Sequence, residues 1–333
     1  MTAPIIAFFN NKGGVGKTSL VYHLAWMYYD LNLKVVAADL DPQANLTAAF
    51  LDEDSLEEIW EANDSYNTVF RCIKPLLSGT GDIADLKLEK IEDDLSILTG
   101  DLQLSEFEDE LSSQWPDCLD RKERAFRVIS AFWRLLTKAA LISNADIVLV
   151  DLGPNLGAIN RAALIASDYV VVPLSPDLFS LQGLKNLGPT LQRWREEWED
   201  RLSRNLVKDL ALPAGKMQPV GYIILQHAVR FDRPVKAFQR WIEKIPQIYN
   251  SEILHEAHNI VSNPAEDPNR IALIKHYQSL MSMAQESRKP IFHLKPADGA
   301  IGAHAAAIKN VYWDFKELAE KIAKRTGLLI LEN

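Results

Sequence analysis

Residues 4–19 read PIIAFFNNKGGVGKTS, and this stretch decides the fold. The run from Pro4 to Asn10 is apolar without alternation, which is typical of a strand buried on both faces of a parallel sheet. A glycine-rich turn follows, and a helical pattern extends from about Thr18 to Leu31. This order of strand, turn and helix predicts a loop whose backbone N–H groups wrap a polyanion at the positive end of the helix.

Further apolar runs and helical patterns alternate along the remaining chain. We expect strands at residues 33–39, 96–99, 146–151, 169–173 and 220–226, and helices at residues 121–141, 181–202, 234–248, 271–285 and 302–325. Strands that alternate with helices predict an α/β fold with a doubly wound, mostly parallel sheet flanked by helices. Together with the glycine-rich loop after the first strand, this is the fold class of P-loop NTPases. We expect a single domain over residues 1–333, with an acidic insertion at residues 52–123, the least patterned part of the chain.

Composition and charge narrow the class of protein. The 333 residues carry a net charge of −9, but residues 1–150 hold 25 acidic and 13 basic side chains, whereas residues 151–333 hold 20 and 23. The C-terminal half is therefore mildly basic, and nucleic acid is not excluded as a partner. Cys72 and Cys118 are far apart, no secretory signal opens the sequence, and no apolar run is long enough to span a bilayer. We expect a cytoplasmic protein.

The glycine-rich loop carries the residue types that bind a nucleoside triphosphate. Lys17 places a positive charge at the β- and γ-phosphates, and the hydroxyl of Thr18 is placed to ligate Mg²⁺. ATP and Mg²⁺ are therefore the expected ligands. The expected nucleotide-binding residues of the loop are Lys12, Gly13, Gly14, Val15, Gly16, Lys17, Thr18 and Ser19.

Carboxylates follow two of the expected strands. Asp39 and Asp41 lie at the end of one strand, and Asp151 ends another. The carboxyl ends of the strands are where open α/β sheets bind ligands. Asp39 and Asp41 share a face because alternate strand residues do, and Asp151 fits the Walker B position that holds Mg²⁺ through water.

The loop departs from the standard G-x-x-x-x-G-K-[ST] pattern, because Asn11 replaces the first glycine and Lys12 opens the loop. In this respect residues 12–18 resemble the deviant Walker A motif of the ParA/MinD family. Residues 35–45 resemble the family's D-x-D-P-Q-G-N segment with Ala44 in place of glycine, and the segment after Asp151 resembles its D-x-P-P segment with Gly153 in place of the first proline. Weaker matches follow at residues 173–183 and 299–304. The resemblance extends from about residue 4 to residue 325 and is to the ParA/Soj partition ATPases.

This resemblance implies an ATPase that binds MgATP between two copies of itself and converts ATP and water to ADP and phosphate. The implied catalytic residues are Lys12, Lys17 and Asp41, and the implied metal-supporting residues are Thr18, Asp39 and Asp151. Lys12 would reach the partner's nucleotide in trans, and Asp41 would orient the attacking water. Hydrolysis would be slow without an activating partner, such as a ParB-like protein. Gln226, at the end of an expected strand, is the expected adenine contact.

A group of basic residues, called here the basic stripe, indicates which partner the ATPase binds. Its five residues lie in an expected loop and helix, and the last three are spaced i, i+4, i+8 on one helix face: Arg230, Arg233, Lys236, Arg240 and Lys244. Such a face binds DNA phosphates in a salt-sensitive way without reading sequence, and a solvated helix surface is the alternative. Together with the resemblance, the stripe predicts a DNA partition or positioning switch that associates with the nucleoid.

Two other functions remain open. One is a regulatory or scaffold ATPase that acts on a protein partner without DNA, for which the acidic residues 52–123 offer a surface. The other is a MinD-like ATPase that cycles on membranes, which needs a free amphipathic basic helix near the C-terminus. Residues 309–325 are amphipathic, but Gly-Leu-Leu-Ile-Leu follows at residues 327–331. We therefore expect that helix to pack on the sheet rather than to enter a membrane.

Overall fold

The computed structural model describes residues 3–61, 68–225, 235–256, 266–275, 277 and 279–330, with the backbone alone at residues 235–237. Its centre is an eight-stranded sheet in the order β3-β4-β2-β5-β1-β6-β7-β8. The β3–β4 pair is antiparallel, and the other neighbouring strands pair in parallel. The strands are β1 (Ile5–Phe8), β2 (Val35–Asp39), β3 (Glu89–Glu92), β4 (Leu95–Leu98), β5 (Ile147–Asp151), β6 (Tyr169–Leu174), β7 (Gln218–Leu225) and β8 (Arg270–Ile274).

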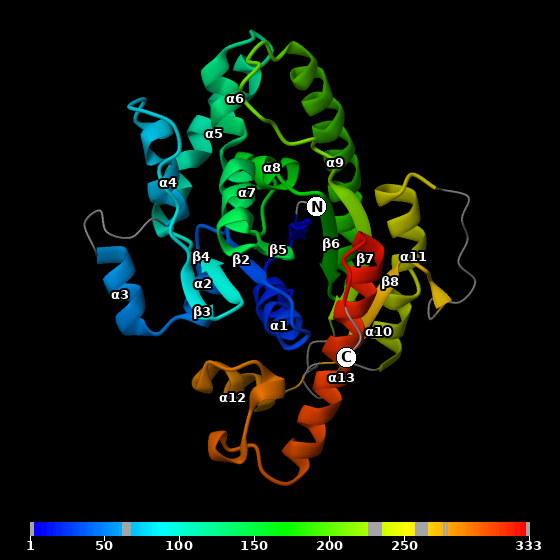
Figure 1. Ribbon diagram of the computed structural model, residues 1–333. Helices are drawn as coiled ribbons and strands as arrows, with labels where there is room; N and C mark the ends of the chain where they lie inside the picture. Colours follow the sequence, from blue (N-terminus) through cyan, green and yellow to red (C-terminus); the bar gives the residue numbers. More distant parts are fainter. Residues whose placement is uncertain are drawn as a thin grey trace.

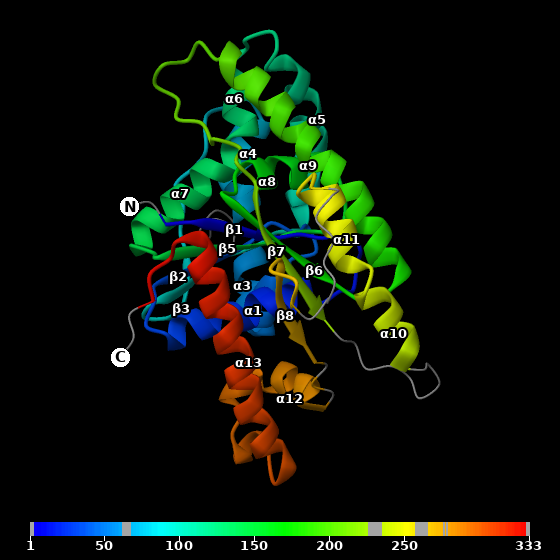
Figure 2. The same ribbon diagram turned by 90° about the vertical axis from the view of Figure 1, so that its right-hand side faces the viewer.

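Helices cover both faces of the sheet, as Figures 1 and 2 show. Helices α1, α12 and α13 pack on one face, and α4 to α9 pack on the other, so the doubly wound fold predicted from the sequence is confirmed. The helices are α1 (Lys17–Asp30), α2 (Asn45–Phe50), α3 (Glu53–Glu61), α4 (Val69–Leu77), α5 (Phe107–Asp117), α6 (Glu123–Ile129), α7 (Ala131–Ser143), α8 (Ala158–Ile165), α9 (Leu178–Arg204), α10 (Val235–Ile242), α11 (Ile245–Ile248), α12 (Ser279–Ser287) and α13 (Ala303–Thr326), with shorter turns η1 (Leu102–Glu106), η2 (Tyr249–Ile253), η4 (Ile291–His293) and η5 (Pro296–Asp298).

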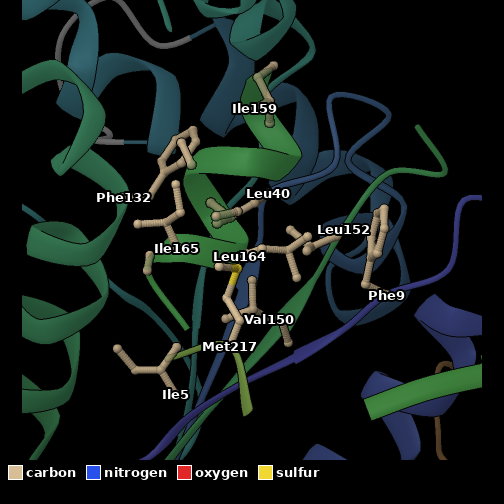
Figure 3. Packing of buried hydrophobic residues seen from close by; sticks show 14 of the residues in the cluster. Ile5, Phe9, Leu40, Phe132, Val150, Leu152, Ile159, Leu164, Ile165 and Met217 are labelled. Carbon is tan, nitrogen blue, oxygen red and sulfur yellow. The ribbon is translucent and has the colours of Figure 1, made fainter. Parts of the chain in front are cut away.

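The central strands are buried on both faces because their residues alternate between two hydrophobic clusters. In β1, Ile5 and Ala7 belong to one cluster, and Ile6 and Phe8 belong to the other. Figure 3 shows part of the first cluster, in which Ile5 and Val150 lie below the side chains of α7 and α8. Burial on both faces explains why these strands are continuous apolar runs in the sequence.

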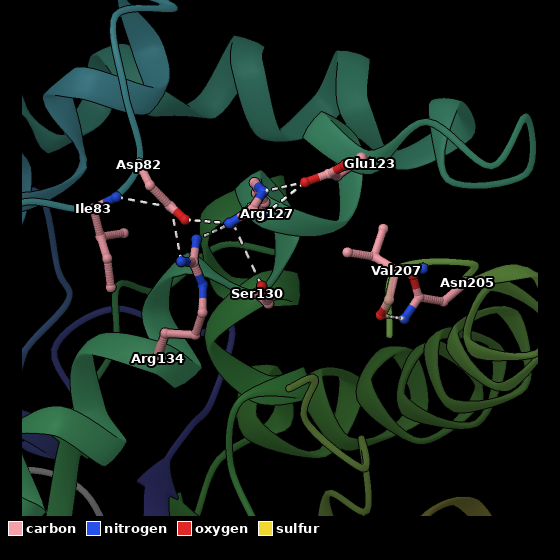
Figure 4. A network of polar contacts seen from close by, with 8 residues as sticks. All are labelled: Asp82, Ile83, Glu123, Arg127, Ser130, Arg134, Asn205 and Val207. Atoms are coloured by element: carbon pink, nitrogen blue, oxygen red, sulfur yellow. Dashed lines mark hydrogen bonds and ion pairs between the residues drawn. The ribbon is translucent and has the colours of Figure 1, made fainter. Parts of the chain in front are cut away.

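The acidic segment at residues 52–123 supplies strands to the sheet and helices to the layer that covers one of its faces. β4 lies between β2 and β3 in the sheet, and α4 and α5 share a hydrophobic cluster with α7 to α9. Ion pairs add to this packing, since Asp82 binds Arg134 at 2.7 Å and Arg127 bridges Asp82 and Glu123 (Figure 4). Helix α3 is attached more loosely, because only two of its nine residues are buried.

Three helix predictions are wrong in part. Residues 271–285 contain strand β8, which pairs with β7, before helix α12 begins. A short apolar run does not separate a buried strand from a helix by its period, and β-branched Ile271 and Ile274 favour the strand. The expected helix at residues 234–248 is divided into α10 and α11, and the one at residues 121–141 is divided at Ser130 into α6 and α7.

Candidate functional site

The loop between β1 and α1 has the backbone of a phosphate-binding loop. Gly14 and Gly16 have positive φ angles of 70° and 88°, a region that favours glycine. A Cβ added at Gly14 would meet no atom within 4 Å, so the space beside this part of the loop is open. Gly16 is the N-cap of α1 and has no side chain to cap it, which leaves the first N–H groups of the helix available to an anion.

A pocket of about 590 Å³ opens over this loop. Residues Gly13 to Ser19 form one wall, Asp41 and Pro154 contribute from the loops after β2 and β5, and Arg288 belongs to the end of the α12 segment. Pockets that bind small ligands and cofactors have volumes in the range of roughly 300–1,000 Å³. The pocket therefore has the size and the phosphate-binding wall that a nucleotide needs.

Thr18 and Asp151 meet beneath the loop, where a metal ion would bind. The hydroxyl of Thr18 donates to Oδ2 of Asp151 at 2.6 Å, whereas the buried Oδ1 has no hydrogen-bond partner in the described part of the chain. Burial, followed by the nearby Asp39, raises the pKa of Asp151. A buried carboxylate oxygen without a donor is a group that a cation would satisfy.

The donor set fits magnesium that arrives with a nucleotide. Mg²⁺ binds one or two carboxylates and keeps water and phosphate oxygens as its other ligands. Within the described ranges, no group of three or more histidine, cysteine or acidic side chains is arranged to cage a metal ion. One hydroxyl from Thr18 and one carboxylate from Asp151 are what such a shared site requires from the protein.

Asp39 and Asp41 occupy different positions relative to the pocket. Oδ2 of Asp39 accepts the backbone N–H and the hydroxyl of Thr47, both at 2.8 Å, and Oδ1 accepts the N–H of Asp41 at 3.2 Å. Both oxygens of Asp39 therefore have protein donors, and this carboxylate holds the loop after β2 in place. Asp41 lines the pocket, and a Cβ added at Gly153 would lie 3.1 Å from its Oδ1.

Lys17 is buried under the loop, with 7% of its surface exposed. Its ammonium donates to the carbonyl oxygen of Lys12 at 3.4 Å. Burial lowers the pKa of Lys17, and the negative charges of Asp151 and Asp41 oppose this effect. An ammonium that contacts its own loop in this way is placed to meet the phosphates of an incoming nucleotide.

Lys12, the early lysine of the loop, is paired within its own chain. Its ammonium forms an ion pair with Asp177, and the two side chains are 27% and 28% exposed. Asp177 is also the N-cap of α9, because its Oδ1 accepts the N–H of Ser180 at 2.9 Å. Asp177 was not predicted from the sequence, although an aspartate before a helical run is a typical N-cap signal.

The loop between β5 and α8 is held by two further side chains that were not predicted from the sequence. Asn160 donates to the carbonyl oxygen of Gly153 at 2.9 Å. Glu108 of α5 accepts the N–H groups of Ala158 and Ile159 at 2.5 and 2.8 Å. No linear pattern connects a residue in α5 with a helix start fifty positions later, so only the fold could bring them together.

The expected adenine contact and most of the basic stripe fall outside the described residues or side chains: Gln226, Arg230, Arg233 and Lys236. Arg240 and Lys244 are exposed, and their charged ends lie 5.0 and 5.3 Å from the centre of the Trp241 ring. Because α10 ends at Ile242, Lys244 lies beyond the helix face that the sequence spacing predicted. The two described basic residues are nevertheless close to one another, around one indole.

Helix α13 packs its apolar stripe on the sheet. Val311, Phe315, Leu318 and Ile322 are buried in the same cluster as α1 and the central strands. The expectation that this helix docks on the sheet is confirmed. In the part of the chain that the structure describes, no helix is both long and apolar enough to cross a membrane.

Solved structures share this fold. A protein from Corynebacterium diphtheriae superimposes with a TM-score of 0.69 at 24% identity, over 97% of this chain and 98% of that one. A putative plasmid partition protein from Borrelia burgdorferi, bound to AMPPNP, gives 0.59 at 19% identity over 97% and 99%. McdA from Cyanothece, solved with ATP, gives 0.62 at 15% identity over 100% and 99%.

Sequence comparisons lead to the family. The sporulation initiation inhibitor protein Soj of Bacillus subtilis is 29% identical over 188 residues, which cover 56% of this chain and 64% of Soj. IncC of Escherichia coli is 28% identical over 193 residues, which cover 56% of this chain and 45% of IncC, so the match spans less than two thirds of either relative. A profile of the AAA domain family AAA_31 matches residues 3–204, more than half of the chain. The chain therefore belongs to the AAA_31 family of P-loop ATPases, and its resemblance to the ParA/Soj partition ATPases is confirmed.

Proposed function

We propose that this protein is an ATP-dependent, dimerising ATPase that acts as a DNA partition or positioning switch. The observation that carries the proposal is the pocket over the phosphate loop, which is lined by Lys17, Thr18 and Asp41, with Asp151 hydrogen-bonded to the hydroxyl of Thr18. A phosphate-binding backbone, a buried lysine and a carboxylate–hydroxyl pair match the charge and shape of MgATP.

Each residue of the site has a separate task in this proposal. Lys17 and the loop N–H groups bind the phosphates, and Thr18 and Asp151 hold Mg²⁺. When bound, Mg²⁺ neutralises charge on the β- and γ-phosphate oxygens. Asp41 orients the attacking water, and Asp39 fixes the loop that carries Asp41. The products are ADP and phosphate.

A second copy of the chain completes the site. Leu178 and Phe179, next to Asp177 in the first turn of α9, are 56% and 73% exposed. Apolar side chains with this exposure, beside the ion pair of Lys12, support a surface that a partner covers on ATP binding. In the homodimer Lys12 leaves Asp177 and reaches the partner's nucleotide, so hydrolysis depends on dimerisation. Turnover then stays slow until a ParB-like activator or another protein partner binds.

Similar proteins support a partition role. One structural neighbour is named a putative plasmid partition protein and binds AMPPNP, and another, McdA, was solved with ATP. By analogy, the ATP-bound dimer binds double-stranded DNA without sequence preference and is released when hydrolysis is stimulated. Arg240 and Lys244 supply the described part of the surface that contacts phosphates. This activity places the protein in the cytoplasm, on the nucleoid.

Binding to random double-stranded DNA tests the proposal, measured with ATP, ADP or no nucleotide at two salt concentrations. We expect binding with ATP that weakens steeply at the higher salt, because phosphate contacts release counterions. Lys17→Ala should abolish ATP binding and, with it, DNA binding. Intact ATP turnover and dimerisation without DNA binding would refute the DNA role.

Charge reversal tests where DNA binds. The double variant Arg240→Glu with Lys244→Glu should lose DNA binding and keep ATP turnover. A matched control reverses two exposed lysines elsewhere, Lys74 in α4 and Lys208 after α9, and makes the same change in net charge. Equal losses in the two double variants would indicate an effect of net charge alone, and not a binding surface around Trp241.

A protein-directed scaffold or regulatory ATPase is the second candidate, and α3 is the observation that favours it. Glu53, Asp54, Glu57 and Glu61 are exposed on this helix, which is fixed to the domain through few buried residues. An acidic, loosely attached helix suits a basic protein partner. Dimerisation and turnover without DNA binding would favour this candidate. The MinD-like alternative requires a free apolar face on α13, and that face is buried on the sheet.

A further inference from the structure

Helix α5 lies outside the nucleotide pocket, but it contacts the start of α8, the helix that follows the pocket-lining loop after β5. The two carboxylate oxygens of Glu108, in the first turn of α5, accept the N–H groups of Ala158 and Ile159 at 2.5 and 2.8 Å. These residues begin α8, which follows the loop from Asp151. A carboxylate that accepts both amides at a helix N-terminus is fixed by two charge-assisted hydrogen bonds and by the helix dipole.

The other end of that loop belongs to the nucleotide site. Gly153 lies beside Asp41, and Pro154 lines the pocket. Asn160, in the first turn of α8, donates to the carbonyl oxygen of Gly153 at 2.9 Å. A shift at the start of α8 is therefore transmitted through Asn160 to the backbone next to Asp41.

Helix α5 is itself held firmly at its far end. The guanidinium groups of Arg161 in α8 and Arg201 in α9 lie 4.3 and 4.0 Å from the ring centre of Trp115. The indole N–H of Trp115 donates to Glu197 at 3.0 Å. Figure 1 shows α5 and α8 on the same face of the sheet. Because Trp115 anchors the helix, Glu108 is presented to α8 from a fixed support.

We propose that Glu108 is a positioning residue for ATP hydrolysis, an inference that rests on the proposed ATPase function. By fixing the start of α8, Glu108 sets the position of the Gly153 backbone against Asp41. Loss of Glu108 should slow hydrolysis, because the Gly153 backbone is then no longer held against Asp41. ATP affinity should stay unchanged, because Glu108 lies outside the pocket and the phosphate loop and Lys17 set this affinity. Misplacement by about 1 Å can cost roughly 100-fold in rate, and we expect about a tenfold fall in kcat.

The test compares two single-charge substitutions in α5 of the full chain. Glu108→Gln keeps the side-chain size but turns one acceptor oxygen into a donor that faces a backbone N–H. Asp109→Asn is the matched control, because this neighbouring side chain is exposed and loses the same charge. ATP affinity is measured with a fluorescent ATP analogue, and single-turnover hydrolysis is normalised to the amount of ATP that each variant binds. We expect the rate loss in Glu108→Gln alone.

Normalisation separates positioning from folding, because a purely structural role would lower the bound ATP and leave the normalised rate unchanged. An unchanged or raised normalised rate, or equal losses in both variants, overturns the inference while the proposed function stands. A wild-type chain that neither binds nor hydrolyses ATP overturns the proposed function and the inference with it. Hydrogen exchange gives a second measurement, since Glu108→Gln should speed exchange at residues 153–160 and Asp109→Asn should not. Unaltered exchange in Glu108→Gln also overturns the inference.

Discussion

Replacing Asp177 with asparagine tests whether the ion pair with Lys12 restrains dimerisation. Asparagine keeps an oxygen that accepts the N–H of Ser180, so the N-cap of α9 is preserved. It carries no negative charge, so the ammonium of Lys12 loses its partner. If Lys12 acts on the partner's nucleotide, it must first leave Asp177. The variant should therefore dimerise more readily than the wild type in the presence of ATP.

The expected size of the effect follows from the exposure of the pair. The side chains of Lys12 and Asp177 are 27% and 28% exposed, so solvent screens part of their attraction. Such a pair contributes about 1 kcal/mol. Two protomers break two pairs, so the substitution should favour the dimer by about 2 kcal/mol, a roughly 30-fold lower dissociation constant.

Analytical ultracentrifugation with a non-hydrolysable ATP analogue measures this constant. Asp177→Ala is the companion variant, because it also removes the N-cap and should cost about 1 kcal/mol of folding stability. In a Lys12→Ala background, Asp177→Asn should change nothing, since the pair is already absent. A dissociation constant for Asp177→Asn that equals the wild-type value would refute the idea that this pair holds Lys12 back.

Three further predictions concern the scaffold around the site. Burial lowers the pKa of His23 to about 4, although the hydrogen bond to the backbone of Ser19 acts in the opposite direction. The unfolded chain therefore binds a proton at this histidine at higher pH than the folded chain does. The contribution of neutral His23 to the free energy of unfolding should be fully present above about pH 6.5 and fall by about 3 kcal/mol as the pH drops to 4. Thermal unfolding of His23→Gln should therefore depend less on pH than that of the wild type. Gly100→Ala should destabilise by about 1–3 kcal/mol and slow ATP turnover, because the new Cβ would lie 2.9 Å from Cγ of Asp39. Gly188→Ala should cost about 3 kcal/mol in urea unfolding while sparing ATP affinity, because its Cβ would lie 1.9 Å from the carbonyl oxygen of Glu252.

The phosphate loop and the central sheet were predictable because their signals are local. The glycines at positive φ, Lys17 and Thr18 all lie within residues 14–18, and the strand before them is a continuous apolar run because both of its faces are buried. A residue that departs from the family pattern also shows its effect in the local backbone. Ala44 stands where the resembling segment has glycine, and it adopts a left-handed φ of 52°, the conformation that glycine accepts without strain.

Contacts between distant segments could not be predicted in the same way. Glu108 meets α8, and Asp177 meets Lys12, only because the sheet places elements far apart in sequence side by side. The strand β8 was mistaken for helix because its five residues are too few to show a period. The proximity of Asp39 and Asp151, by contrast, was predictable, because the two residues are parallel partners at the ends of β2 and β5. Two strands that each end in aspartate predict convergence, but not which oxygen faces the pocket.

The balance of charge in the site explains why binding and hydrolysis should have different requirements. Asp41 and Asp151 lie close to Lys17, and Lys12 forms an ion pair with Asp177. One lysine and one Mg²⁺ suffice to hold a triphosphate against the loop, whereas phosphoryl transfer gains from a further cation at the charge that develops. Lys17→Ala should therefore lose ATP binding, whereas Lys12→Ala should bind ATP with near wild-type affinity and fail to hydrolyse it. Equal loss of affinity in the two variants, measured by titration calorimetry, would show that Lys12 serves its own nucleotide and would remove the argument for a second copy.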